Sequence, residues 1–224
     1  MKVIKVFGYR FGKYTIDDLN TPSQQLKYNE RKFYKIAIID DESFIHLEKL
    51  QNLGFDIHHY PDIINLEMLS SYHIIICDIK GVGKKFDSKF EGAFLISELK
   101  KKYPFKIFAV YTGSAFDLNI NDYLAGVQII KKDYGIEDWA TAIDALIYEV
   151  GDPKTVWKKL RNDLLEKNVP LKVLISLEDE FVDTVLNKNC NFTDFPSNKN
   201  SLDSDVVDLI INVVVKGVTI LSNS

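Results

Sequence analysis

Residues 72–78 read YHIIICD, a short apolar run that ends in an acidic residue. A run of this length between turn-forming residues is typical of a strand that is buried on both faces of a parallel sheet. Four further runs have the same character, and they predict four more strands: KIAIID (35–40), FDIHHY (55–60), KIFAVY (106–111) and VQIIK (127–131).

Helical patterns alternate with these runs. Helices are expected at about 42–53, 62–70, 91–103, 117–125 and 137–149. A strand and a helix repeated five times, with right-handed crossovers, predict an α/β fold of the flavodoxin-like (βα)5 type with a parallel five-stranded sheet. In that fold a ligand binds at the carboxyl ends of the strands.

The sequence outside this region indicates two further parts. Residues 151–224 carry amphipathic patterns opened by Asp152 and Pro153, and they predict a small all-α module for output or dimerisation. The last apolar run of this module predicts burial against the other helices or against a second copy of the chain. Residues 1–34 have no clear period and predict an N-terminal arm or a hairpin. The expected division is therefore 1–34, 35–150 and 151–224.

Composition and charge narrow the classes of function. The 224 residues are 46% hydrophobic and 27% charged, which is an ordinary globular balance, and the net charge is −4. Residues 151–224 carry 9 Lys and Arg against 11 Asp and Glu, which argues against a DNA-binding output because phosphate neutralisation needs a basic face. Two widely spaced cysteines, and no apolar stretch suited to a leader or a membrane span, predict a cytoplasmic protein without a membrane partner.

Polar residues gather at the expected strand ends. Asp40 and Asp41 follow the first strand, Asp78 ends the third, Thr112 follows the fourth and Lys131 ends the fifth. Three carboxylates at one sheet edge repel one another, and a hard divalent cation, Mg²⁺ or Mn²⁺, relieves that repulsion. A lysine and a hydroxyl facing the cation can bind phosphoryl oxygens. The set predicts phosphoryl transfer to an aspartate nucleophile. The simpler alternative is that these carboxylates only cap the helices that follow them.

These residues, in this order, resemble the receiver domain of two-component response regulators. The resemblance covers roughly residues 33–150, and each of its features alone is weak. The matched features are the Asp40-Asp41 pair after KIAII, Asp78 after HIIIC, the helix EGAFLISELKKKYP, the Thr112-Gly113 pair after IFAVY, and Lys131 after VQII.

The resemblance implies a role for each matched residue. Asp78 would accept the phosphoryl group. Asp41 and Asp78 would bind the metal, with Asp40 helping directly or through water, and the backbone carbonyl of Lys80 would be a further ligand. On the other side of the site, Thr112 would bind a phosphoryl oxygen beside the Gly113 amide, and Lys131 would pair with another oxygen.

The sequence departs from the family's pattern at three places. Lys132 replaces the proline that usually follows the active-site lysine, and Gln128 occupies the position of the usual aromatic switch. The loop at 80–92 is longer than usual and rich in glycine and lysine, which predicts a mobile basic flap that contacts the phosphoryl group or its donor.

The function that follows is a response-regulator-like signalling protein. Asp78 would accept phosphate, with Mg²⁺, from a histidine kinase or a small phosphodonor, and the C-terminal helices would contact a protein partner. Its catalysis would be limited to self-phosphorylation and autodephosphorylation. The alternative is an interaction scaffold that keeps the receiver-like fold and works without phosphate, and a DNA-binding regulator ranks third.

Overall fold

A computed structural model describes residues 5–6, 9–10, 12–19, 28–86, 88–104, 106–113, 120, 122–187 and 191–218. The chain forms two compact units. We call Gln25–Val150 the sheet unit, and Met1–Gln24 together with Gly151–Ser224 the helical unit. The first 24 residues therefore group with the C-terminal helices, although 126 residues separate them in the sequence.

Five parallel strands form the centre of the sheet unit, and they confirm the predicted fold. They lie in the order β4-β3-β5-β6-β7. This order is the flavodoxin-like one, in which the first two strands along the chain exchange places. The strands are β3 (Lys35–Ile39), β4 (Asp56–Tyr60), β5 (Ile74–Asp78), β6 (Ile107–Thr112) and β7 (Gln128–Lys131).

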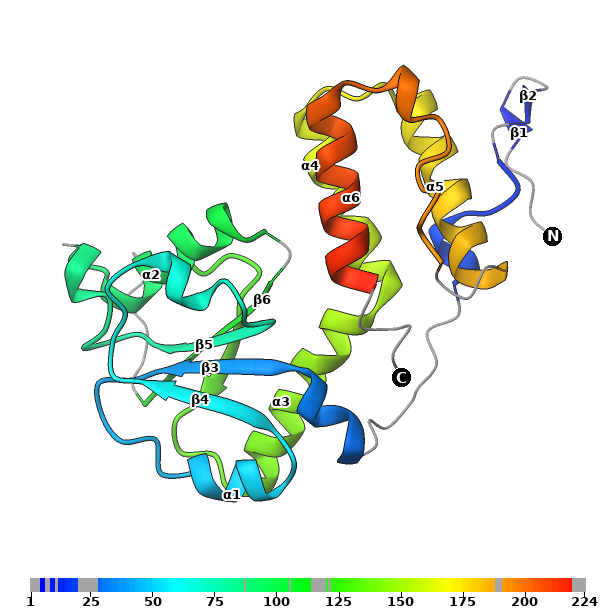
Figure 1. The fold of residues 1–224 in the computed structure, drawn as a ribbon. Coiled ribbons are helices and arrows are strands. Elements are labelled where there is room, and N and C mark those ends of the chain that lie inside the picture. The colour runs from blue at the N-terminus through cyan, green and yellow to red at the C-terminus, as the bar shows by residue number, and fades with distance from the viewer. Residues whose placement is uncertain are drawn as a thin grey trace. The chain divides into compact units, whose positions relative to one another are not determined.

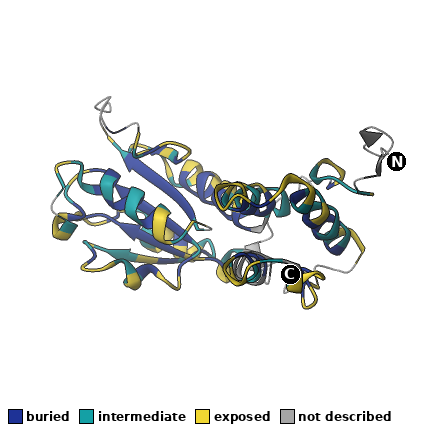
Figure 2. Cartoon of the chain, turned by 90° about the horizontal axis from the view of Figure 1, so that it is seen from above, coloured by how far each residue is buried: buried dark blue, intermediate teal, exposed yellow. Residues whose placement is uncertain are grey.

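Helices cover both faces of this sheet (Figure 1). Helix α2 (Glu91–Lys102) lies on one face, and α1 (Leu47–Asn52) and α3 (Ile136–Gly151) lie on the other. The central strands β3, β5 and β6 are accordingly buried on both sides, whereas the edge strands β4 and β7 are partly exposed (Figure 2). Burial on both faces explains why the strands read as continuous apolar runs in the sequence.

Two of the predicted helices differ in the structure. The segment expected to be helical at 62–70 forms only a 3-10 turn, η3 (Leu66–Leu69). The reason is that Asp62 instead accepts hydrogen bonds from the amides of Ile63, Gly83 and Lys84, which commits it to the loop after β5. In the helix expected at 117–125, residues 117–119 and 121 lie outside the described residues, and residues 122–126 form turns.

The helical unit contains α4 (Pro153–Glu166), α5 (Leu171–Asn187) and α6 (Ser204–Val218), as the amphipathic patterns predicted. The Asp152 side chain caps α4 by accepting the amides of Lys154 and Thr155. The Trp157 ring of α4 lies 5.2 Å from the Phe181 ring of α5, and both side chains are fully buried. Among the described residues, no helix is long and apolar enough to cross a membrane.

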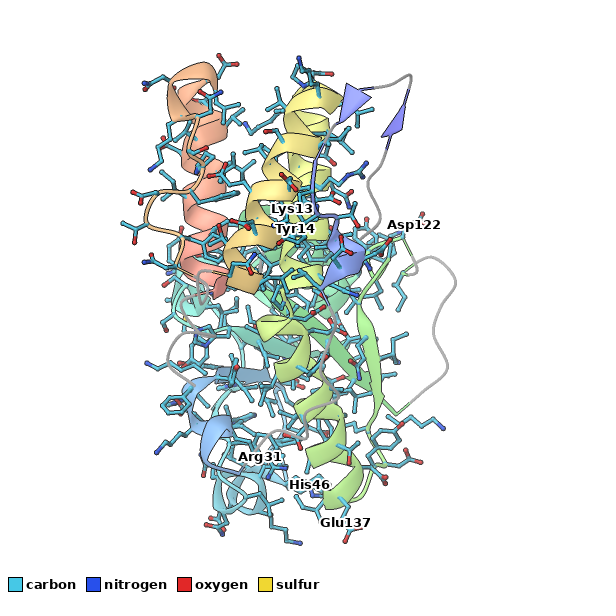
Figure 3. The ribbon with its side chains drawn as sticks, turned by 90° about the vertical axis from the view of Figure 1, so that its right-hand side faces the viewer. Lys13, Tyr14, Arg31, His46, Asp122 and Glu137 are labelled. Carbon is cyan, nitrogen blue, oxygen red and sulfur yellow. The ribbon has the colours of Figure 1, made fainter. Side chains whose placement is uncertain are left out.

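The N-terminal segment contacts α5. It begins with the short antiparallel pair β1 (Lys5–Val6) and β2 (Tyr9–Arg10). The Asp179 Oδ1 atom accepts the amides of Lys13 and Tyr14 at 2.6 and 2.5 Å (Figure 3). Residues 28–33 belong instead to the sheet unit, where the Arg31 guanidinium donates to both oxygens of Asp144 on α3. The residues of the expected N-terminal segment, 1–34, are therefore divided between the two units.

Candidate functional site

Two buried carboxylates lie at the carboxyl edge of the sheet. Asp40 directly follows β3, and Asp78 is the last residue of the neighbouring strand β5. Asp40 is 2% exposed and Asp78 is 6% exposed. Asp78 Oδ1 accepts the Ile79 amide at 2.6 Å, and Asp40 Oδ1 accepts the Glu42 amide at 2.9 Å. Each carboxylate therefore has one oxygen fixed by the backbone and a second oxygen turned to side chains.

One lysine lies close to the Oδ2 atoms of both carboxylates. The Lys132 Nζ atom lies 2.9 Å from Asp78 Oδ2 and 3.8 Å from Asp40 Oδ2, and it also lies 3.5 Å from Glu42 Oε2. Burial lowers the pKa of Lys132, but the hydrogen bond and charge of Asp78, together with Asp40 and Glu42, raise it above its ordinary value. Lys132 is therefore a permanent cation at this edge.

This lysine is one residue beyond the one that the sequence indicated. Lys131 is exposed, and the ammonium group against Asp78 belongs to Lys132. Side chains alternate between the two faces of a strand, so neighbouring lysines at a strand end point in opposite directions. The structure therefore brings Lys132, and not the expected Lys131, into contact with the Asp78 carboxylate. Counted from Lys132, the position of the usual aromatic switch, three residues earlier, is Ile129 rather than Gln128.

Thr112 and Gly113 lie next to this edge. Thr112 is the half-buried last residue of β6, directly after Tyr111, which is the register partner of Asp78. The Thr112 carbonyl accepts the Lys132 amide at 3.0 Å. A Cβ atom at Gly113 would meet the Lys132 side chain only at an ordinary contact distance of 3.8 Å. Gly113 thus borders the lysine that contacts Asp78.

Asp41 lies at the exposed margin of the site. Its side chain is 38% exposed, and its Oδ2 atom lies 3.2 Å from the Nζ atom of Lys84. The Lys80 side chain is exposed, and its amide lies 3.5 Å from Asp78 Oδ1. Gly81 has a φ of +80°, and a Cβ atom there would come within 2.2 Å of Asp41 Oδ1. A side chain at position 81 would therefore displace Asp41.

The loop after β5 is fixed at several points in this structure. Asp62 accepts the Gly83 amide at 2.7 Å, and Glu91 accepts the Gly81 amide at 2.9 Å. Val82 is fully buried between these two anchors. A Cβ atom at Gly92 would lie 2.0 Å from the Asp78 carbonyl oxygen, so only glycine lets α2 start this close to the strand. These hydrogen bonds hold the loop backbone in a position from which the Lys84 side chain reaches Asp41.

Sequence reasoning missed one member of the site, Tyr111. This side chain is 1% exposed, and its hydroxyl donates a hydrogen bond to Asp40 Oδ2. Burial and the hydrogen bond to Asp40 raise the pKa of Tyr111 far above its ordinary value, so the hydroxyl remains a neutral donor. The only signal in the sequence was a polar group inside the apolar run IFAVY, directly before Thr112.

The chemistry of the donor set fits a hard divalent cation. The described residues contain no group of three His, Cys, Asp or Glu side chains arranged around one ion. Mg²⁺ needs only one or two carboxylates, since it keeps several waters. Asp40, Asp41 and the Lys80 carbonyl offer only oxygen atoms, and the two carboxylates now lie against the ammonium groups of Lys132 and Lys84. A metal would bind here by replacing an ammonium contact.

The sheet unit is similar to response-regulator receiver domains. A receiver domain protein from Clostridium thermocellum is 26% identical with a TM-score of 0.41, and the match covers 51% of this chain and 94% of that one. CheY4 of Vibrio cholerae is 14% identical with a TM-score of 0.40, and the match covers 50% of this chain and 98% of that one.

These similarities extend over about half of the chain, and their TM-scores are below 0.5. No protein-family model and no curated protein matches the chain. Function is therefore inferred from the geometry of the site itself.

Proposed function

We propose that the sheet unit is a response-regulator-like signalling module in which Asp78 accepts a phosphoryl group with the help of Mg²⁺. The observation that carries this proposal is the buried Asp78 carboxylate, which ends a central strand and contacts the Lys132 ammonium at 2.9 Å. A carboxylate nucleophile beside a fixed cation is the arrangement that phosphoryl transfer requires.

The residues of the chain have separate tasks in this reaction. A carboxylate oxygen of Asp78 attacks the phosphorus of a phosphohistidine or of a small acyl phosphate. A new P–O bond forms, and the bond to the leaving group breaks with its electron pair. Lys132 stays charged and neutralises the phosphoryl oxygens. Thr112 donates its hydroxyl to a second phosphoryl oxygen beside the Gly113 amide.

Two acidic residues and a backbone carbonyl hold the metal in this proposal. Asp41 and Asp40 are its carboxylate ligands, and the Lys80 carbonyl is its third protein ligand. Bound by these residues, a divalent cation would supply positive charge beside the phosphoryl oxygens during the transfer. Because Asp41 is exposed, it can exchange Lys84 for the metal with little rearrangement.

Signal output follows from the added charge. A phosphoryl group adds close to two negative charges at an edge that now balances acidic groups against lysines. The C-terminal helices are the proposed contact for a protein partner or a second copy of the chain. Membrane and DNA partners have no part in this proposal.

The test is the mass of the intact full-length chain after incubation with acetyl phosphate and Mg²⁺. We expect the mass to increase by one phosphoryl group, and we expect no increase for Asp78→Asn. Lys132→Met should slow the reaction strongly, since the cation at the acceptor is lost. Lys131→Met is the matched control, and it should react at the wild-type rate.

A second candidate is a phosphate-independent interaction scaffold. It is favoured by the present pairing of the carboxylates, because lysines already neutralise Asp41 and Asp78. No adduct with acetyl phosphate and no adduct with a phosphorylated histidine donor would support this candidate. An adduct that is lost in Asp78→Asn contradicts it.

A further inference from the structure

Tyr111 connects the acidic edge with helix α3. Its hydroxyl donates to Asp40, and its ring lies 5.3 Å from the Trp139 ring of α3 at an interplanar angle of 81°. Both side chains are 1% exposed. One rigid, buried side chain therefore contacts the candidate metal ligand at one end and the helix at the other.

Two further aromatic side chains complete this contact. The Phe44 ring lies 5.0 Å from the Trp139 ring, and the His46 ring lies 6.4 Å from it. We call Phe44, His46, Tyr111 and Trp139 the aromatic cluster. His46 belongs to the segment before α1 and faces the first turns of α3, near Glu137 (Figure 3). The segment after Asp40 therefore packs against the start of α3 through aromatic rings.

The polar atoms of this cluster are not all satisfied. Within the described part of the chain, the buried Trp139 Nε1 and His46 Nδ1 atoms have no hydrogen-bond partner. Buried polar nitrogens are nearly always paired in folded proteins, so each exception needs an explanation. A displacement of Trp139 loses no hydrogen bond from its indole and can gain one. This part of the core is therefore suited to a second arrangement.

Helix α3 passes directly into the helical unit along the chain. It ends at Gly151, and α4 begins at Pro153, so only the capping residue Asp152 separates the two helices.

We propose that Tyr111 is a positioning residue that couples the occupancy of Asp40 to Trp139 and α3. A cation on Asp40 withdraws electron density from the carboxylate that accepts the Tyr111 hydroxyl, and the hydrogen bond weakens. The Tyr111 ring then shifts against Trp139, and the aromatic cluster repacks. This coupling rests on the proposed function, because it names how that site communicates with the rest of the chain.

The two tryptophans make the coupling measurable in the full-length chain. Trp157→Phe leaves Trp139 as the only indole, and Trp139→Phe leaves Trp157 in the helical unit. We expect MgCl₂ alone to change the tryptophan emission of the wild type and of Trp157→Phe. Trp139→Phe should show no change. The two variants are complementary, so the assignment holds even where one of them is less stable.

Tyr111→Phe in the Trp157→Phe background tests the hydroxyl itself. It keeps the ring and removes only the donor to Asp40, and we expect it to lose most of the emission change while calorimetry still detects magnesium binding. Tyr72→Phe is the matched control. Tyr72 is also buried, at 6% exposure, and its hydroxyl bonds to Tyr60 away from the acidic edge. This control should keep the full emission change.

The outcomes separate the two proposals. Magnesium binding without any change in Trp139 emission overturns the coupling and leaves the proposed function intact. A full emission change in Tyr111→Phe also overturns the coupling, since the hydroxyl would then be dispensable. If calorimetry detects no magnesium binding and no phosphoryl adduct forms on Asp78, the proposed function itself fails.

Discussion

Both tryptophans of the chain are fully buried, and each lies near carboxylates. The groups that bind these carboxylates differ between the two units. In the helical unit, Trp157 donates its Nε1 proton to Glu178 Oε2 at 2.8 Å, and the other oxygen of Glu178 accepts the Ile16 amide. In the sheet unit, the Trp139 ring packs on the Tyr111 ring, whose hydroxyl donates to the Asp40 carboxylate.

The partners of the carboxylates differ in the same way. Glu178 and Asp179 are bound by indole and backbone N–H groups, which cannot leave without moving the N-terminal segment or the core. Asp41 and Asp78 are bound by lysines whose side chains are 63% and 35% exposed. Ammonium groups on flexible stems can be exchanged for a metal ion or a phosphoryl group. The first cluster is therefore a structural one, and the second can change its occupant.

The largest expected effect tests the structural cluster. Glu178→Ala removes the acceptor of the buried Trp157 indole and of the Ile16 amide. An unpaired buried donor costs about 1–3 kcal/mol, so we expect the free energy of unfolding of the helical unit to fall by about that amount. Urea denaturation followed by Trp157 emission in the Trp139→Phe background measures this loss.

Two controls define this result. Glu178→Gln keeps one acceptor oxygen and should lose less stability than Glu178→Ala. Glu166→Ala changes an exposed carboxylate on α4 and should stay within about 0.5 kcal/mol of the wild type. Magnesium should leave all these unfolding midpoints unchanged. A magnesium-dependent midpoint for Glu178→Ala would contradict the division between the two clusters.

The next effect tests the exchangeable cluster. Lys132→Met leaves Asp40 and Asp78 buried without their shared cation. Loss of one partner of a fully buried pair costs about 3–5 kcal/mol, and the 35% exposure of Lys132 reduces this to roughly 1–2 kcal/mol. Magnesium can supply the missing charge, so it should stabilise this variant more than it stabilises the wild type. Thermal unfolding with and without MgCl₂ measures both quantities.

Lys131→Met is the matched control for this variant, because it removes a neighbouring but exposed ammonium group. Its stability and its response to magnesium should equal those of the wild type. If the two variants behave in the opposite way, the active lysine is Lys131, and the register of the site described above is wrong.

These two lysines also mark the limit of what the sequence could predict. The five strands were predictable because each is a short apolar run, and the acidic residues at their ends followed from the rule that strands of a parallel sheet end at one edge. The choice between Lys131 and Lys132 was not predictable, because it depends on the face of the sheet from which each side chain projects. A slip of one residue exchanges the faces.

Tyr111 was unpredictable for a different reason. In the sequence it is one more aromatic residue in a buried strand, and packing is the ordinary explanation for such a residue. Its hydroxyl matters only because Asp40 lies two strands away in the sheet and within hydrogen-bonding reach. Contacts between distant segments of this kind depend on the twist and register of the sheet, which local patterns do not encode.

The smallest expected effect concerns the exposed margin of the exchangeable cluster. Lys84→Met removes the ammonium group that competes with a metal for Asp41. An exposed ion pair is worth about 0.2–1 kcal/mol, so magnesium should bind up to about fivefold more tightly by calorimetry. Lys85→Met removes the same charge from the next position, which is also exposed, and should leave the affinity unchanged. Equal affinities for the two variants would mean that Asp41 is not a ligand, because then no contact of Lys84 would have to be broken when the metal binds.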